Sequence, residues 1–456
     1  MKIRNLVIAL VVLVLLGGGY YGSIAWKNRK VDSPVPVYEP PLRLGNLDEP
    51  VKIKVPGIVL IKNNDEWELS YPSIPGIKLD QSRIRSIAWS LASVVVNRMV
   101  EEAPTDLSLY GLDKPSAQAV LADASGSTAK YFLGSLAPSR NEYYIMEESD
   151  PNVYIVSSYT AESLMPSLDS IRQKTLFRSF EPNELTSLRL ESPQALIDVR
   201  AKPEFLPVHL SCGLFSYILV SPYILARGVD SEALQTLIAP LGNLSISDFI
   251  DDNPSSLRPY GLDAPARISL RLGDETLDLL IGNQTEGKRY AKLAGALGVF
   301  TLSGMEPVLN TRAFSLTDKF ALILNIDAVD RLEIRGGEKD LVAEFRGKGD
   351  DAVFTLNGKN AESKSFRTFY QSVIGLMFDA EYGVPAGIPR NSPAANSAGV
   401  ITIEYRLNTP PGTQASLTLI PYTRDFYILS QEGTTEFLIS VNQVRNIFET
   451  AEKVIF

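Results

Sequence analysis

Two segments of the sequence repeat one another 150 residues apart, and this repetition limits the folds that the chain can adopt. The pattern Tyr-Gly-Leu-Asp-x-Pro occupies residues 110–115 and 260–265, each time before an alternating, strand-like run. The pattern aromatic-x-Leu-x-x-Pro, at residues 67–72 and 217–222, has the same offset. Because pattern, order and spacing agree, we infer tandem copies of one structural unit of about 135 to 150 residues.

A third and divergent copy begins near residue 326. It contains Tyr382-Gly383, which match the start of the turn pattern, but lacks the Leu-Asp-x-Pro part. The length of the chain, 456 residues, also favours about three folded units. We therefore divide the chain into an N-terminal membrane anchor (1–30), a proline-rich stalk (31–50), repeat unit 1 (51–180), repeat unit 2 (181–325) and a divergent repeat unit 3 (326–456).

The first unit illustrates the structure expected of each repeat. Residues 51–72 alternate between apolar and polar side chains, as a pair of strands does. The following segment predicts a helix with Ile84, Ile87, Leu91, Val94 and Val95 on one face. After the Tyr-Gly-Leu-Asp-x-Pro turn, alternating runs at 117–122, 129–133, 142–147 and 152–156 predict a four-stranded meander, and a helix follows near residues 161–168.

The turn itself has a physical basis. Gly111 can adopt the left-handed conformation that ends a helical turn, and Pro115 favours extended backbone at the preceding residue. The pattern thus predicts a turn that begins a strand. We expect an α+β fold, in which an N-terminal transmembrane helix is followed by tandem repeats of antiparallel sheet with helices packed on one face.

Residues 6–25 contain no charged side chain and, as a helix, would extend about 30 Å, the thickness of a bilayer core. Lys2 and Arg4 precede this segment, and Lys27, Arg29 and Lys30 follow it. We predict an uncleaved anchor, although Ser23-Ile24-Ala25 resembles a signal-peptidase site. The predicted location is the inner or cytoplasmic membrane, in a single pass, with the body on the extracytoplasmic side.

Charge and rare residues exclude several classes of function. The chain carries a net charge of −9, which does not suit a nucleic-acid-binding protein. It has one cysteine, Cys212, and one histidine, His209, so an intrachain disulfide, a Cys-x-x-Cys redox pair and a zinc site rich in Cys or His are excluded.

These residues resemble a known bacterial family, domain of unknown function 4340. The shared pattern is an opening strand pair with Trp-x-Leu-x-x-Pro, a helix, the Tyr-Gly-Leu-Asp-x-Pro turn, and a Leu-Gly hairpin before a Tyr-Tyr strand, at residues 51–176. The second unit matches with Tyr217 in place of the tryptophan, and the third matches in outline. The resemblance implies a membrane-anchored protein, and some members look like partners of ABC-type transport systems, including those of the gliding-motility type.

Residues 282–288 fit the first seven positions of a phosphate-binding loop, but Arg289 stands where Ser or Thr would bind magnesium. A strand-like run follows instead of a helix, so we predict a hairpin. His209 and Cys212 are candidates for a base and a nucleophile, yet their spacing places them on opposite faces of a strand, and we favour packed side chains. Asp248, Asp251 and Asp252 could bind a hard cation, although solvated turn residues explain them better.

The aromatic residues Trp67, Tyr217 and Phe354 occupy equivalent positions and are predicted to anchor the core of each unit. We assign no catalytic, cofactor-binding or metal-binding residue. The expected function is that of a non-enzymatic extracytoplasmic scaffold or accessory protein, in an ABC-type transport complex by resemblance. Two alternatives are an extracytoplasmic carboxylate-dependent glycan hydrolase and a module that captures a ligand for a transporter.

Overall fold

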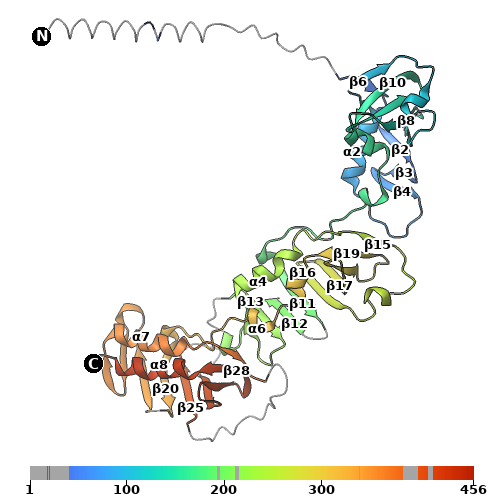
Figure 1. Cartoon of the computed structure of the whole chain (residues 1–456). Helices are drawn as coiled ribbons and strands as arrows, with labels where there is room; N and C mark the ends of the chain where they lie inside the picture. Colours follow the sequence, from blue (N-terminus) through green and yellow to red (C-terminus); the bar gives the residue numbers. More distant parts are fainter. Residues whose placement is uncertain are drawn as a thin grey trace, which may run out of the picture. The chain divides into compact units, whose positions relative to one another are not determined.

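The computed structural model describes Gly18, Tyr20 and residues 41–456, with gaps at 193–195, 211–214, 338, 384–398 and 409–413. The chain forms two compact units, of which the first comprises Met1–Ser73 with Gln81–Ser167 and the second Ile74–Asp80 with Leu168–Phe456 (Figure 1). The predicted anchor helix falls, apart from Gly18 and Tyr20, outside the described residues. Among the helices that are described, none is long and apolar enough to cross a membrane.

The first unit contains an eight-stranded sheet in the order β4-β3-β2-β7-β8-β9-β10-β6, together with a two-stranded sheet of β1 and β5. All of these strands pair antiparallel. Their bounds are β1 (Arg43–Leu44), β2 (Pro50–Val55), β3 (Ile58–Asn63), β4 (Glu66–Tyr71), β5 (Val94–Val95), β6 (Arg98–Glu101), β7 (Ala117–Asp123), β8 (Thr128–Leu136), β9 (Glu142–Glu147) and β10 (Asp150–Ser157).

The second unit contains two nine-stranded sheets, in the orders β14-β13-β12-β11-β16-β17-β18-β19-β15 and β23-β22-β21-β20-β25-β26-β27-β28-β24. The first of these has strands β11 (Leu185–Glu191), β12 (Leu196–Ala201), β13 (Tyr217–Ser221), β14 (Arg227–Gly228), β15 (Phe249–Asp251), β16 (Ala266–Leu272), β17 (Glu275–Thr285), β18 (Lys288–Leu293) and β19 (Val299–Ser303). The other has β20 (Val329–Arg335), β21 (Leu341–Arg346), β22 (Val353–Leu356), β23 (Lys359–Ala361), β24 (Ala380–Glu381), β25 (Ile401–Leu407), β26 (Gln414–Pro421), β27 (Phe426–Gln431) and β28 (Thr434–Ser440).

The three large sheets have one topology. In each, the first three strands run outward from the centre, the four-stranded meander continues on the other side, and a short strand that precedes the meander in sequence pairs with its last strand. The structure is thus mostly antiparallel sheet, with a few helices, and the domain is repeated. We refer to the parts built on these three sheets as repeats 1, 2 and 3.

Helices follow the third strand and the meander of each repeat. The α-helices are α2 (Gln81–Ala92), α3 (Ser158–Leu164), α4 (Ser231–Ile238), α5 (Glu306–Leu309), α6 (Ala313–Leu316), α7 (Ser363–Ile374) and α8 (Val441–Glu452). Short 3-10 helices are η1 (Leu107–Tyr110), η2 (Leu168–Ser170), η3 (Pro182–Glu184), η4 (Val208–Leu210), η5 (Ala239–Leu241), η6 (Arg258–Tyr260), η7 (Ile326–Ala328) and η8 (Gly349–Asp351). In repeat 3, α7 and α8 lie side by side on the sheet (Figure 1).

Helix α2 is shorter than its apolar periodicity predicts. Ile84, Ile87 and Leu91 are buried on one helical face, as expected, but the helix ends at Ala92. Val94 and Val95 instead form β5, which pairs with β1. Val94 is buried and Val95 is exposed, which is the alternation of a strand and not of a helix. The spacing of apolar residues alone did not distinguish a helix from a strand at residues 94 and 95.

The Tyr-Gly-Leu-Asp-x-Pro pattern forms a corner that is the same in repeats 1 and 2. The corner glycines Gly111 and Gly261 end η1 and η6 with φ angles of 64° and 67°. The glycine of the Leu-Gly pattern lies against this corner: a Cβ atom on Gly134 would come within 2.2 Å of the Tyr110 carbonyl oxygen. On Gly282 it would come within 2.1 Å of the Tyr260 carbonyl oxygen. The two repeated patterns therefore occur together because they are in contact.

The predicted core anchors are confirmed. Trp67, Tyr217 and Phe354 are all buried, and they lie on β4, β13 and β22, which are equivalent strands. The last part of the predicted stalk also joins the core of the first unit, since Leu44 and Leu47 are buried and β1 pairs with β5. Residues 31–40 of the stalk lie outside the described part of the chain.

Candidate functional site

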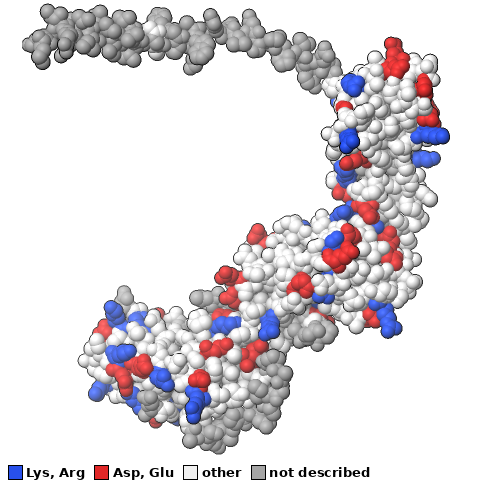
Figure 2. Space-filling view, in the orientation of Figure 1, with Lys and Arg blue, Asp and Glu red and all other residues white. Residues whose placement is uncertain are grey.

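Each large sheet has one face covered by helices and one open face, and the open faces carry the polar side chains. Along β11, the apolar Leu188 and Leu190 are buried while Arg189 between them is exposed. In the view of Figure 2, basic and acidic side chains are intermingled over the described surface and not separated by sign. This arrangement favours pairing between neighbouring strands.

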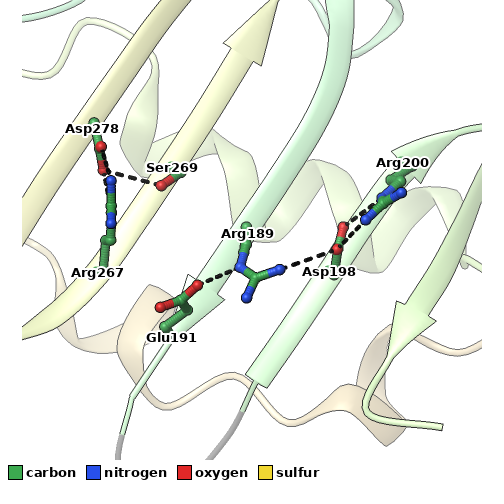
Figure 3. A network of polar contacts seen from close by, with 7 residues as sticks. All are labelled: Arg189, Glu191, Asp198, Arg200, Arg267, Ser269 and Asp278. Carbon is green, nitrogen blue, oxygen red and sulfur yellow. Dashed lines mark hydrogen bonds and ion pairs between the residues drawn. The ribbon is translucent and has the colours of Figure 1, made fainter.

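The open face of repeat 2 carries a network of ion pairs on four adjacent strands (Figure 3). Asp198 on β12 accepts hydrogen bonds from Arg200, at 3.0 Å to Nε and 2.7 Å to Nη2, and lies 3.6 Å from Nη1 of Arg189. The other side of Arg189 donates to Glu191. The side chain of Asp198 is only 6% exposed, so its charge is compensated within the sheet.

The neighbouring strands β16 and β17 hold a second group. Asp278 accepts a hydrogen bond from Nε of Arg267 at 2.7 Å and another from Oγ of Ser269 at 3.0 Å. The hydrogen bonds of Arg267 lower the pKa of the Asp278 carboxyl, and Asp278 in turn raises the pKa of Arg267. Ser269, Asp278 and residues of β11 and β12 line a hollow of about 680 Å³. The charges of Arg267 and Asp278 are thus paired across the two strands.

The open face of repeat 3 has a hollow of similar size, about 640 Å³, over β20, β25 and β26. Its floor carries Arg331 and Glu333 on β20, and Glu404 and Arg406 on β25. Arg331 donates to Glu333 at 2.6 Å and to Glu344 at 2.9 Å. The hydrogen bond of Arg331, followed by that of Arg335, lowers the pKa of Glu333. Glu333 is thus held as a carboxylate.

The hollow of repeat 3 is also bordered by residues of repeat 2. His209 lies in the segment between β12 and β13, where repeat 1 has only a short turn. Its Nδ1 atom lies 2.9 Å from Oε1 of Glu432, and its Nε2 atom lies 3.2 Å from the carbonyl oxygen of Ala226. Glu432 belongs to the turn between β27 and β28. The side chain of His209 is 5% exposed, so the residue is packed between two repeats.

Buried polar groups join repeats 2 and 3 next to this hollow. Arg227 on β14 donates to Oε1 of Gln431 at 2.6 Å and lies 3.5 Å from Glu436. Burial lowers the pKa of Arg227, partly offset by Glu436. Glu436 also accepts a hydrogen bond from the backbone of Ile224 at 2.6 Å. Loss of one partner would leave a buried charge uncompensated, so these contacts fix the position of repeat 3 against repeat 2.

The open face of repeat 1 differs in its chemistry. Lys52 and Lys54 are its exposed residues on β2, and Val59 is the half-buried neighbour of Lys54 on β3. On β8, the ammonium of Lys130 lies 4.9 Å from the ring centre of Phe132. Lys130 also forms an ion pair with Glu148. This face therefore combines lysine with carboxylates and apolar side chains, whereas the corresponding faces of repeats 2 and 3 combine arginine with carboxylates.

The structure gives each candidate acid a partner from the protein. Asp248 accepts from Lys288 at 2.6 Å and from Thr301 at 2.7 Å. Asp252 binds Arg172 at 2.5 Å, and Asp251 accepts from the hydroxyl of Tyr260 at 3.1 Å. Over the described part of the chain, no group of three His, Cys, Asp or Glu residues is placed to hold a metal ion. Asp248 and Asp252 thus pair with side chains distant in sequence, and their carboxylates are not simply solvated turn residues.

The remaining candidates are also located. Residues 282–288 form the end of β17 and the turn to β18, so the predicted hairpin is confirmed and the helix that a phosphate-binding loop requires is replaced by a strand. Cys212 lies outside the described residues. Sequence reasoning missed the ion pairs of the open faces. Several join residues two apart on one strand, and the alternating charges of β11, β12 and β20 were the available signal for these. Others, such as Arg267 with Asp278, join neighbouring strands and leave no local signal.

Comparison with known proteins identifies two copies of one domain. The family model described as "Domain of unknown function (DUF4340)" matches residues 67–204 and 220–381, which together make up more than half of the chain. The two matched stretches begin within the equivalent strands β4 and β13. No curated protein and no solved structure matches the chain.

Proposed function

Because the chain belongs to the family described as domain of unknown function DUF4340, which names no activity, we propose a function from its architecture. The protein is a non-enzymatic scaffold or accessory protein of a membrane transport complex of the ABC type. Residues 6–25 anchor it in the cytoplasmic membrane, and the repeats lie on the extracytoplasmic side. The open sheet faces are the surfaces on which its partners dock.

The observation that carries this proposal is the pairing of charges on the open face of repeat 2. A catalytic carboxylate needs a pKa suited to its role and access to a substrate. The pKa of Asp278 is instead lowered by the arginine beside it, and Asp198 is enclosed by two arginines. Rigid, internally neutralised faces on a repeated sheet suit a docking surface, where charge complementarity gives specificity.

The test is affinity purification of the tagged full chain from detergent-solubilised membranes, with mass spectrometry of the proteins that accompany it. We expect subunits of a membrane transporter. A matched pair of variants gives specificity: R267E should reverse the charge on the open face of repeat 2 and reduce recovery of the partner, while Lys364→Glu, on the first turn of helix α7, should leave it unchanged. Recovery of the protein alone, or equal loss in both variants, would refute the proposal.

A glycan hydrolase is the second candidate, and one observation favours it. Glu333 and Glu404 lie directly opposite each other in the β20–β25 register, inside the hollow of repeat 3. Most glycoside hydrolases use two neighbouring carboxylic acid side chains as their catalytic residues. The lowered pKa of Glu333 does not suit the acid of such a pair. Release of reducing ends from purified cell-wall glycan by the wild type, abolished in Glu404→Gln, would establish this alternative.

A further inference from the structure

The hollow of repeat 3 has the size and position of a small-molecule site. Its volume of about 640 Å³ lies within the range of about 300 to 1,000 Å³ that is common for ligand pockets. Its floor is the open face of a sheet, and one border comes from another repeat, through the segment that carries His209. Insertions that one repeat has and its sister lacks are frequent places for binding.

Charges on the floor of this hollow are arranged unfavourably for the protein alone. Glu333 faces Glu404 across the strand pair, and Arg331 faces Arg406. Like charges directly opposite each other destabilise a sheet. Glu333 and Arg331 are neutralised by each other and by Arg335 and Glu344. Glu404 and Arg406 form no hydrogen bond or ion pair with any residue that the structure describes.

The sister hollow of repeat 2 shows that the fold does not require this arrangement. The position of Glu404 is occupied there by Ser269, which bonds Asp278, and the position of Arg406 is occupied by Arg271. Arg271 donates from Nε to the carbonyl oxygen of Gly273 at 2.8 Å. In repeat 2, both residues at these positions thus have a hydrogen-bond partner, whereas Glu404 and Arg406 in repeat 3 have none among the described residues. We expect such a difference between equivalent positions where a bound ligand, and not the protein, supplies the partner of the charged side chain.

We propose that the hollow over the third sheet binds a small zwitterion of the amino-acid or short-peptide kind, whose carboxylate contacts Arg406 and whose ammonium contacts Glu404. The two side chains lie two residues apart on the same strand face, a spacing of about 7 Å between Cα atoms. Their cross-strand neighbours Gln414 and Ser416 can hydrogen-bond an intervening amide. The inference goes beyond the scaffold function, since it concerns a ligand and not a docked protein.

Charge balance argues for a zwitterion over a simple ion. An anion alone would meet Arg406 but would be repelled by the nearby Glu404 and Glu432. A cation alone would meet Glu404 but would lie beside two arginines. A molecule with both charges satisfies both groups at once, and an arginine suits a carboxylate through its two parallel N–H donors.

The test is isothermal titration calorimetry on the full chain purified in detergent, with trialanine as the probe and its N-acetylated and C-amidated forms as comparisons. We expect trialanine to bind, and each blocked form to bind roughly tenfold or more weakly because it lacks one charged contact. The substitutions R406Q and E404Q should each weaken trialanine by a similar factor, while R271Q, at the sister position, should leave binding unchanged.

Both substituted residues are exposed, so the variants are expected to keep the melting temperature of the wild type, which is measured alongside. Equal affinities for trialanine and its blocked forms would overturn the proposal. So would unchanged binding in R406Q and E404Q, or no binding of trialanine up to about 10 mM. Since the calorimetry contains no partner protein, its failure is separate from a failure of the scaffold proposal, which depends on co-purification.

Discussion

The position that lies against the corner tyrosine is a glycine in repeats 1 and 2 and an isoleucine in repeat 3. In the first two repeats, Gly134 and Gly282 lie against the carbonyl oxygen of the corner tyrosine. By strand register, the equivalent residue of repeat 3 is Ile420, which packs in a small cluster with Tyr382 and Ile428. In repeat 3, whose sequence lacks the Leu-Asp-x-Pro pattern, an apolar cluster therefore lies where repeats 1 and 2 have the contact between glycine and backbone.

The same three sheets differ still more on their open faces. Repeat 1 shows lysine and apolar side chains, and repeat 2 shows a network of paired charges. In repeat 3, Glu404 and Arg406 form no hydrogen bond or ion pair among the described residues, although Glu404 attracts Arg335. The strand order is retained in all three, with one additional edge strand, β14 or β23, in repeats 2 and 3. Packing thus constrains one face of the sheet, whereas the other face is free to differ, and we place the binding functions there.

The largest expected effect concerns the glycine contact. Gly282→Ala should destabilise the second unit by about 4 kcal/mol, because the new Cβ atom meets a backbone oxygen that no side-chain rotation can move. Gly134→Ala should do the same to the first unit. The measurement is urea unfolding, with hydrogen exchange of peptides from the affected repeat as the probe.

The matched control is Gly242→Ala. That glycine has no left-handed φ, and its added Cβ atom would lie 3.7 Å from the nearest oxygen, which is an ordinary contact. The free energy of unfolding of the Gly242→Ala variant should therefore change little. Equal effects of Gly282→Ala and Gly242→Ala would show that the corner contact does not explain the repeated pattern.

The next effect tests the replacement in repeat 3. Ile420 is 3% exposed, so Ile420→Ala should create a cavity and cost about 3 kcal/mol. Ile455, which is 62% exposed, provides the control, and Ile455→Ala should be nearly neutral. Thermal unfolding of the two variants gives the comparison. If Ile420→Ala were as mild as Ile455→Ala, the apolar cluster would not be the substitute for the glycine corner.

Much of this architecture was predictable from the sequence, and the reason is physical. The 150-residue offset runs through β4, α2 and the corner, so Ile84 and Leu91 correspond to Leu234 and Leu241, which are buried as well. The end of α2 was predicted wrongly, because Val94 continues the apolar helical face while lying in a strand. Pairing with β1 decided that position, and a partner distant in sequence leaves no local signal.

A smaller effect distinguishes the open faces of repeats 2 and 3. The pKa of Asp278 is lowered in the folded state by Arg267, so its stabilising contribution is present above the ordinary value of 3.8 and is lost as the pH falls toward the folded pKa. Repeat 3 has Ser416 at that position, and its lowered carboxyl pKa belongs to Glu333 instead. Asp278→Asn should remove less than about 1 kcal/mol, because the pair is screened by solvent.

The measurement for Asp278→Asn is the free energy of unfolding between pH 5 and pH 3, compared with that of the wild type. The difference between the two proteins should be present at pH 5 and should shrink toward pH 3. A difference that stays constant over this range would mean that the Arg267 contact does not act through the ionised carboxylate.

The smallest effect concerns a buried tyrosine of repeat 3 at a position where repeats 1 and 2 have leucine. Tyr405 stands where repeats 1 and 2 have Leu121 and Leu270, and its hydroxyl has no hydrogen-bond partner among the described residues. Burial raises its pKa. Tyr405→Phe should therefore leave stability unchanged within about 0.5 kcal/mol, or raise it slightly, because no hydrogen bond is lost.

Tyr370 is the matched control, since its hydroxyl donates to the carbonyl oxygen of Leu324 at 2.8 Å. Tyr370→Phe should cost about 1 kcal/mol. Chemical denaturation of the two variants makes the comparison. A loss in Tyr405→Phe as large as that in Tyr370→Phe would mean that the hydroxyl of Tyr405 has a role that its surroundings do not reveal.

The candidate sites were less predictable than the fold. His209 and Glu432 are 223 residues apart, and their contact follows from the docking of repeat 3 on repeat 2, which no local pattern encodes. The sequence did indicate that His209 lies in an insertion without a counterpart in the other units. The charges of the open faces were visible as alternation along single strands, and pairs such as Arg200 with Asp198 follow from it. Pairs between strands, such as Arg267 with Asp278, depend on the strand register.

The central claim, that the open sheet faces are the docking surfaces, is tested most directly by site-specific photo-crosslinking in intact membranes. The crosslinking amino acid is placed in turn at Ser269 and Glu404, on the open faces, and at Gln235 and Gln371, which are exposed on helices α4 and α7. We expect the two open-face positions to crosslink to a membrane transport subunit and the two helix positions to form no crosslink to it. Crosslinks from the helix positions alone would contradict the claim.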